Sequence, residues 1–590
     1  MLSTLKTLDI IVVVVLLIFL VVASLYSSFK KKSAEEYFMA GRSLRWWSVA
    51  GSIFGTNIHA QQIIGMMSVG FSIGFAQSHY EVWAVPAVLV LAYIFVPIYR
   101  KRSFFTLSEF LEQRYNSYAR LAYVIVIFAF ILGQLVAGFY IGSRILGLLF
   151  AGTSIEMTYL TGILTIASVT VFFSVFGGME SVVIADNILT VIMILSILLM
   201  GYFTYSQPEI NGISGLLSLD HASANKMHLY LPANHPKLPW PGIFTGLTIL
   251  NFFYWTTNQY QVQRVMAAKT EKDAKLGALA AGFLKLIIPF FSIAVGTAGF
   301  YLFSARLGEG AVKPDDIFLM LLKTVVPNGY GITGLILTGL ICAIFSAIYS
   351  MMNSVSTMFA FDVYRKYINK NSTDGQTVMS GRAFVLLMCA IASFFAFTTY
   401  DPNSTENFFL KLADQVSYLK PGLVIAFFWG VFWKKTNPWA AVIILLSSPF
   451  IGLGCDFVYN HFLNQNQWIL NTFGEKLNFL YRVFLITVVG SMLIFGLSLF
   501  LNKKNTVYET ELTVPLNGLG SKVFVFGLVQ LFWLLTIYFH IFTTQNVALF
   551  ASITAFLFFT KSLRGKFWEN DVFYAGLLVS ITTWILYFFA

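Results

Sequence analysis

Residues 46–72 read WWSVAGSIFGTNIHAQQIIGMMSVGFS, an apolar stretch long enough to span a membrane but carrying polar residues at its centre. Its polar and glycine positions include Gly51, Gly55, Asn57, His59, Gln61, Gln62 and Gly65. In a bilayer, an interrupted helix is tolerated only where it contacts protein or lines a cavity, and such breaks form the binding sites of transporters. The stretch therefore predicts a helical membrane protein with a binding site in the middle of this span.

The composition of the whole chain supports this prediction. Of 590 residues, 57% are hydrophobic and 11% are charged, whereas soluble domains are about 45–50% apolar and about 25% charged. The apolar residues suffice for roughly sixteen helices of about 20 residues each. A soluble globular protein is excluded, and we expect an all-α polytopic membrane protein. The net charge is +11. In a membrane protein, such an excess of lysine and arginine more often lies in loops, where it sets their orientation, than binds nucleic acid.

Sixteen apolar stretches are predicted to span the membrane. They are residues 8–28, 46–72, 79–99, 119–150, 157–177, 182–204, 241–261, 275–304, 329–361, 381–399, 404–433, 438–459, 479–501, 522–542, 544–560 and 571–589. Lysine and arginine concentrate in the odd-numbered loops, including Arg100, Lys101, Arg102 and Arg264. The positive-inside rule places these loops in the cytoplasm. We expect a multi-pass protein of the cell membrane with both termini outside.

Polar residues at membrane depth recur five spans later in the chain. The seventh, eighth and ninth spans contain Asn251 and Asn258, Lys285, and Ser346 to Ser354. Because five is an odd number of crossings, a second unit of five spans starts on the opposite side of the membrane and is inverted. Inverted repeats that bind substrate at their interface are common in secondary transporters. The spacing favours such an architecture, although the two halves show no residue-level identity.

Several motifs along the chain carry a resemblance to a known family. They are EYFMAGRSL at 36–44, NIHAQQIIGM at 57–66, TLSEFLE at 106–112, NFFYWTTNQYQVQRVMAA at 251–268, FLKL at 283–286 and FWKKT at 432–436. Together they resemble the sodium/solute symporter family, specifically its sodium/glucose cotransporter branch. The resemblance extends in order over about residues 8 to 545.

The resemblance implies a LeuT-like core of two inverted five-helix repeats with additional flanking helices. It divides the chain into an extra N-terminal helix with its loop (1–45), a first repeat (46–204), an extracellular loop (205–240), a second repeat (241–433), peripheral helices (434–545) and additional C-terminal helices (546–590). The implied activity is sodium-coupled uptake of a glucose- or galactose-like hexose by alternating access. Sodium would be the coupling ion, and no organic cofactor is expected.

The resemblance also assigns a substrate site. A pyranose presents hydroxyls at its rim and C–H groups on its faces, so it needs polar partners and an aromatic surface. The sugar-contacting positions correspond to Asn57, Gln62, Glu81, Asn251 and Lys285, and the stacking ring to Tyr254. For Asn57 and Gln62 the alternative is interhelical packing. For Glu81, which lies near the start of its span, the alternative is a position at the membrane–water interface.

The family pattern places gates on both sides of this site. Met66, Tyr80 and Phe409 match an outer hydrophobic gate, although such residues are also ordinary core fillers. Tyr254 and its neighbour Trp255 match the position that blocks inward exit of the sugar.

The implied sodium ligands come from two spans. They are the backbone carbonyls of Gly55, Ile58 and Ala343 and the hydroxyl of Ser346. The next position, where many relatives carry a second hydroxyl, is Ala347. Asp186 resembles a family acid linked to a second cation or to proton handling, and its burial would be costly unless it is paired.

Substrate identity stays open at the sequence level. The resemblance aligns Ala413 with a glutamine that contacts the sugar in glucose and galactose transporters. Either Gln415 makes this contact instead, or the substrate carries a different pattern of hydroxyls. Symport of inositol, sialic acid or an amino acid, or coupling to protons, are the alternatives. The seven histidines form no motif with carboxylates, so an enzyme is not expected. The partners are therefore the solute, sodium and the lipid bilayer, and the oligomeric state is not predicted.

Overall fold

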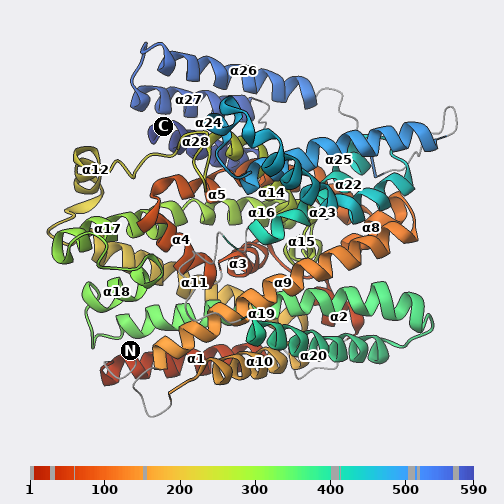
Figure 1. Ribbon diagram of the computed structural model, residues 1–590. Coiled ribbons are helices and arrows are strands. Elements are labelled where there is room, and N and C mark those ends of the chain that lie inside the picture. The colour runs from red at the N-terminus through yellow and green to blue at the C-terminus, as the bar shows by residue number, and fades with distance from the viewer. Residues whose placement is uncertain are drawn as a thin grey trace.

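The computed structural model describes residues 5–26, 33–58, 60–150, 156–399, 411, 414–502, 512–513, 519–561 and 570–590. Within these ranges the chain is helical and forms no β-strand. The long helices lie alongside one another and run across the molecule in roughly one direction (Figure 1). This arrangement is the one expected of a bundle that crosses a membrane.

The first half of the chain forms helices within the predicted spans and shorter helices between them. They are α1 (Thr7–Tyr26), α2 (Ala34–Met39), α3 (Trp46–Asn57), α4 (Ala60–Ser72), α5 (His79–Val82), α6 (Val85–Val90), η5 (Leu91–Phe95), α7 (Val96–Lys101), α8 (Leu107–Arg114), α9 (Ser117–Phe150), α10 (Tyr159–Phe176), α11 (Gly178–Tyr205) and α12 (Gly212–Ala222).

The second half continues in the same way. Its main helices are α13 (Trp240–Gly242), η6 (Ile243–Leu247), α14 (Thr248–Phe252), η7 (Phe253–Thr257), α15 (Gln259–Met266), α16 (Glu271–Lys285), η8 (Pro289–Ile293), α17 (Ala294–Leu307), α18 (Ile317–Thr324), α19 (Ile332–Met358), η10 (Phe359–Ile368), α20 (Asp374–Thr398), α22 (Lys420–Phe432), α23 (Pro438–His461), α24 (Gln467–Phe473), α25 (Phe479–Leu501), α26 (Leu519–Tyr538), α27 (Thr544–Thr560) and α28 (Asp571–Phe588).

The number of complete spans differs from the sixteen predicted. In the described part of the chain, ten helices are long and apolar enough to cross a membrane, and five shorter apolar helices accompany them. One reason is that two predicted spans are broken into short pieces, 46–72 at Ile58 and 241–261 at several points. The structure therefore shows an integral membrane protein but does not confirm the count of sixteen.

Burial distinguishes central helices from peripheral ones. In the helix that runs from Ile332 to Ile368, 83% of the most apolar window is buried, against 22% in α1. Large apolar side chains such as Leu499 and Phe500 of α25 are exposed, as expected of residues that face lipid. The helix α19 with η10 thus forms the centre of the bundle, and α1 and α25 lie at its margin.

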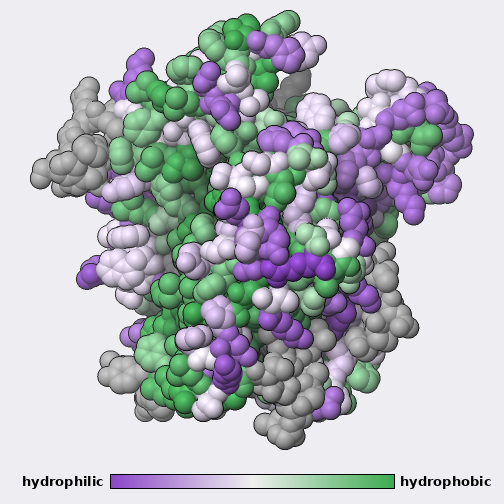
Figure 2. All heavy atoms as spheres, turned by 90° about the vertical axis from the view of Figure 1, so that its left-hand side faces the viewer, coloured by the Kyte–Doolittle hydropathy of each residue, from purple (hydrophilic) through white to green (hydrophobic). Residues whose placement is uncertain are grey.

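Segments predicted to lie on the same side of the membrane lie at the same end of the bundle. The N-terminal end of α1 and the helix α12 lie at the left-hand end in Figure 1, and α2 and α8 lie toward the other. The backbone N–H of Leu229 donates to the carbonyl of Phe589 at 3.0 Å, which joins the C-terminus to the loop that carries α12. Figure 2 shows this end of the molecule, where polar side chains gather among hydrophobic ones. Which end faces outward stays a prediction.

Candidate functional site

The second predicted span is broken where its polar cluster lies. The helix α3 ends at Asn57, Ile58 has the non-helical angles φ −92° and ψ 82°, and α4 begins at Ala60. A matching break lies at Asn258 between η7 and α15, where φ is −92° and ψ is 116°. The two breaks fall in the first span of each predicted repeat. The predicted unwinding is confirmed, and the inverted relation of the repeats stays a prediction.

Next to the first break, four of the predicted substrate residues form one buried polar network. The Lys285 ammonium lies 2.7 Å from a carboxylate oxygen of Glu81 and donates to the amide oxygen of Asn57 at 2.9 Å. The other Glu81 oxygen accepts a hydrogen bond from the Gln62 amide. Glu81 is fully buried within the protein. Each charge is paired, as burial in a membrane protein requires.

The remaining predicted substrate residues come from the second broken helix. Asn251 is buried, and its amide nitrogen has no hydrogen-bond partner among the residues that the structure describes. The Lys285 ammonium lies 5.9 Å from the centre of the Trp255 ring, within cation–π range. The rings of Tyr254 and Trp255 meet edge to face at 6.1 Å. Residues from α3, α4, α5, η7 and α16 thus converge on one region. Asn251 lies four residues before Trp255 on the adjoining α14.

The structure describes two of the three predicted outer-gate residues. Met66 is fully buried, and its sulfur accepts a hydrogen bond from the Gln77 amide at 3.0 Å. Tyr80 precedes Glu81 on α5 and is half-buried. Phe409 and Ala413 lie outside the described residues, whereas Gln415 is exposed. The gate assignment stays a prediction.

The predicted sodium ligands on α3 and α19 are in contact. The Ser346 hydroxyl lies 3.0 Å from the Gly55 carbonyl oxygen, and Ala343, one turn earlier on α19, is buried. A Cβ atom at Gly55 would lie 2.9 Å from the backbone oxygen of Asp186, so glycine permits α3 to approach α11. Ile58, the fourth proposed ligand, is the first non-helical residue after α3.

Asp186 adjoins this group and is paired. Its carboxylate accepts hydrogen bonds from Ser52 at 2.6 Å, Ser346 at 2.8 Å and Tyr349 at 2.9 Å. The guanidinium of Arg264 lies 3.6 Å away, and both charged side chains are fully buried. The sequence analysis counted Arg264 among the loop cations, which is wrong because the residue lies within α15. Ser346 joins the proposed sodium ligands and Asp186 into one polar group.

A small cavity lies beside Ala347. Its volume is about 20 Å³, and its lining includes Thr56, Tyr260, Ala343 and Ala347. A water molecule needs roughly 10–15 Å³ of such volume. Ala347 therefore borders a space large enough for one water.

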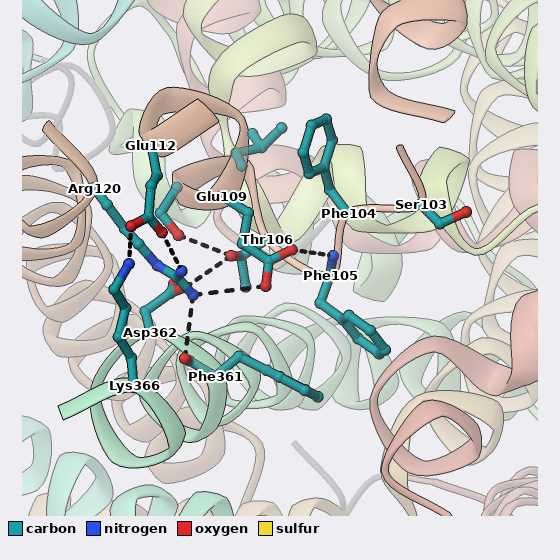
Figure 3. Close-up of polar contacts among 12 residues, drawn as sticks. Ser103, Phe104, Phe105, Thr106, Glu109, Glu112, Arg120, Phe361, Asp362 and Lys366 are labelled. Carbon is teal, nitrogen blue, oxygen red and sulfur yellow. Dashed lines mark hydrogen bonds and ion pairs between the residues drawn. The ribbon is translucent and has the colours of Figure 1, made fainter. Parts of the chain in front are cut away.

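A second charged cluster, which the sequence analysis did not single out, lies where α8, α9 and η10 meet (Figure 3). Arg120 contacts one carboxylate oxygen of Asp362 through Nε at 2.9 Å and Nη2 at 2.6 Å, and contacts Glu112 at 2.6 Å. Lys366 pairs with the other Glu112 oxygen. Burial raises the pKa of Glu109 above its ordinary value, and the Asp362 carboxylate adds to the rise.

Hydrogen bonds also connect the loop before α8 to this cluster and to the second broken helix. The Thr106 hydroxyl donates to Asp362 at 2.8 Å. The amide of Gln259, at the start of α15, accepts from the backbone of Leu107 at 2.7 Å and donates to the carbonyl of Phe105 at 3.3 Å. The loop therefore connects η10 to the helix that follows the Asn258 break.

We expect Arg120→Ala to lower the thermal stability of the protein by several degrees. Removing one partner from a buried ion pair costs about 3–5 kcal/mol, and Asp362 is 1% exposed. Arg306→Ala is the matched control because its pair with Glu209 is partly exposed, and such pairs contribute about 0–1 kcal/mol. Thermal unfolding in detergent measures both. Equal shifts for the two variants would contradict the account.

The chain was compared with known proteins. The family model described as the sodium:solute symporter family matches residues 37–446. A sodium/glucose cotransporter of Vibrio parahaemolyticus is 31% identical over 444 residues, which cover 71% of this chain and 79% of the relative. A human sodium/myo-inositol cotransporter 2 is 29% identical over 463 residues, 73% of this chain and 67% of the relative.

Solved structures show the same fold. The structure of a sodium-coupled sialic acid symporter, described as substrate-bound and outward-open, matches with a TM-score of 0.70 at 19% identity, over 84% of this chain and 98% of that one. Membership of a transporter family also supports the expectation that the chain is not an enzyme. The family model covers well over half of the 590 residues, and the chain belongs to the sodium:solute symporter family.

Proposed function

We propose that the protein couples the inward movement of sodium to the uptake of a glucose- or galactose-like hexose across the cell membrane. The observation that carries this proposal is the buried network of Lys285, Glu81, Asn57 and Gln62. It presents charged and amide groups that donate and accept hydrogen bonds, as the rim of a pyranose requires. Tyr254 supplies the aromatic face.

The breaks in the two helices suit alternating access. Broken helices at the interface of two repeats expose backbone groups to the substrate and the coupling ion, and rocking of one repeat against the other opens the site to each side in turn. The polar group around Lys285 and the one around Ser346 both border the Ile58 break, since Asn57 belongs to the first and Gly55 to the second. Solute and sodium would thus bind next to the same break.

Sodium coupling is compatible with alanine at position 347. The carbonyls of Gly55, Ile58 and Ala343 and the Ser346 hydroxyl would supply four oxygens. The cavity beside Ala347 has room for one water. This water would supply a fifth oxygen ligand. Asp186 would balance the charge through Ser346, because both side chains are buried and in hydrogen-bond contact.

We expect Ala347→Ser to lower the sodium concentration for half-maximal uptake by about two- to tenfold. The added hydroxyl would occupy the cavity and replace a water whose position is not fixed by a side chain, and one such hydrogen bond is worth about 0.5–1.5 kcal/mol. The measurement is the sodium dependence of uptake into proteoliposomes. An unchanged sodium dependence would count against a cation site at this position.

Competition for uptake tests the proposed substrate. Uptake of labelled glucose and galactose would be measured in proteoliposomes with an inward sodium gradient and increasing unlabelled hexose, inositol, sialic acid or neutral amino acid. We expect the hexoses to compete at the lowest concentration. Stronger competition by inositol or sialic acid would overturn the hexose assignment and make Ala413 the position that sets a different hydroxyl pattern.

A further inference from the structure

A large groove lies beside the first half of α3, between α11 and α16. It has a volume of about 1190 Å³ and is bordered by α3, α11 and α16, with Tyr574 of α28 at its edge. Such a volume exceeds the roughly 300–1,000 Å³ typical of pockets for small molecules. Its walls are mainly apolar, with Val183, Ile184, Ile188, Leu279, Phe283 and Leu284 among the lining residues.

The mouth of the groove, unlike its walls, is lined by charged and aromatic side chains. Arg45 and Lys272 line it, both are exposed, and neither forms an ion pair with any residue that the structure describes. Trp46 and Trp47 are 43% and 48% exposed beside them, as is typical of tryptophan at a membrane–water interface. Glu180 is the one carboxylate of the lining. A second carboxylate, Asp273, accepts a hydrogen bond from the backbone N–H of Trp46 at 3.1 Å. The mouth therefore combines two exposed cations and two exposed tryptophans with two carboxylates.

We propose that this groove binds an anionic phospholipid. The acyl chains would lie along the apolar walls, and the headgroup phosphate would bind between Arg45 and Lys272. Both cations belong to loops that the positive-inside rule places in the cytoplasm, and anionic lipids are concentrated in the cytoplasmic leaflet. Basic pockets between membrane helices bind such headgroups.

The bound lipid would brace the helices that carry the proposed cation site. Asn187 lines the groove, and its amide donates to the Val183 carbonyl at 2.7 Å. Its neighbour Asp186 contacts Ser52 of α3 and Ser346 of α19. The lipid would therefore contact the same α3–α11 pair that holds these polar residues.

Native mass spectrometry of the full-length protein tests the proposal. The protein in detergent would be given equal amounts of phosphatidylglycerol and phosphatidylcholine with the same acyl chains. We expect preferential retention of phosphatidylglycerol, and a fall in this preference of about tenfold in R45Q/K272Q, because two headgroup contacts are lost. The control K370Q/K561Q removes the same charge from two exposed lysines outside the groove and should retain the preference.

Two further variants keep the proposal testable if R45Q/K272Q fails to fold. Glu180→Gln removes the negative charge from the lining and should increase retention of phosphatidylglycerol. Ala280→Trp fills the apolar part of the groove and should reduce retention of both lipids. Equal retention of the two lipids by the unaltered protein, or no change in Glu180→Gln, would overturn the proposal. Displacement by inorganic phosphate would also overturn it, by indicating a site for a soluble anion.

Discussion

Replacing Lys285 with alanine is expected to reduce sodium-driven hexose uptake about a hundredfold. The lysine contacts both Glu81 and Asn57 in a buried setting, and each hydrogen bond to a charged group is worth about 1.5–3 kcal/mol. Its removal also leaves the Glu81 carboxylate unpaired in the membrane interior, which costs about 3–5 kcal/mol. Uptake of labelled hexose into proteoliposomes measures the effect.

Two further variants separate binding from stability. Lys275→Ala lies on the same helix, where Lys275 forms a more exposed pair with Glu271 at 2.7 Å, and it should leave uptake nearly unchanged. The double variant Lys285→Ala/Glu81→Ala removes both charges, so it should recover thermal stability without recovering uptake. If the double variant transported hexose normally, Lys285 would serve only to neutralise Glu81, and the substrate assignment would be wrong.

The second large effect is expected for Ser346→Ala. The variant loses a hydroxyl that contacts both the Gly55 carbonyl and the Asp186 carboxylate. We expect the sodium concentration for half-maximal uptake to rise by about tenfold to a hundredfold, because contacts to charged groups are worth about 1.5–3 kcal/mol each. The measurement is uptake as a function of sodium at saturating hexose.

Ser350→Ala is the matched control for this variant. Ser350 lies one turn further along α19, is fully buried, and contacts the Thr56 hydroxyl at 3.2 Å. It lies outside the proposed ligand set, so its loss should change the sodium dependence only slightly. The same sodium dependence in both variants would contradict the proposed cation site.

The sequence predicted the architecture well because the physical signals were local. Asn57 and the glycines around it interrupt an apolar run, and the structure ends α3 at Asn57. The count of spans was less secure, because runs such as 241–261 contain short π-helical and extended pieces rather than one continuous helix. Apolar length indicates that a segment is buried in the bilayer but not where its backbone departs from α-helix.

The candidate site was predicted in part. Lys285 and Glu81 could be singled out because a charge in a span needs a partner, and the structure pairs them. The same reasoning required a partner for Asp186 but could not identify Arg264, which follows an apolar run and resembles a loop cation. Pairing between residues so far apart depends on how α11 and α15 pack, which no local pattern encodes.

Gradient-driven accumulation tests the central claim most directly. Purified protein in lipid vesicles would be given labelled glucose or galactose with an inward sodium gradient, an inward proton gradient, or neither. Our account predicts accumulation above the external concentration with the sodium gradient alone. Accumulation with the proton gradient alone would contradict sodium coupling and favour proton handling by Asp186, and no accumulation of either hexose under any gradient would contradict the hexose assignment.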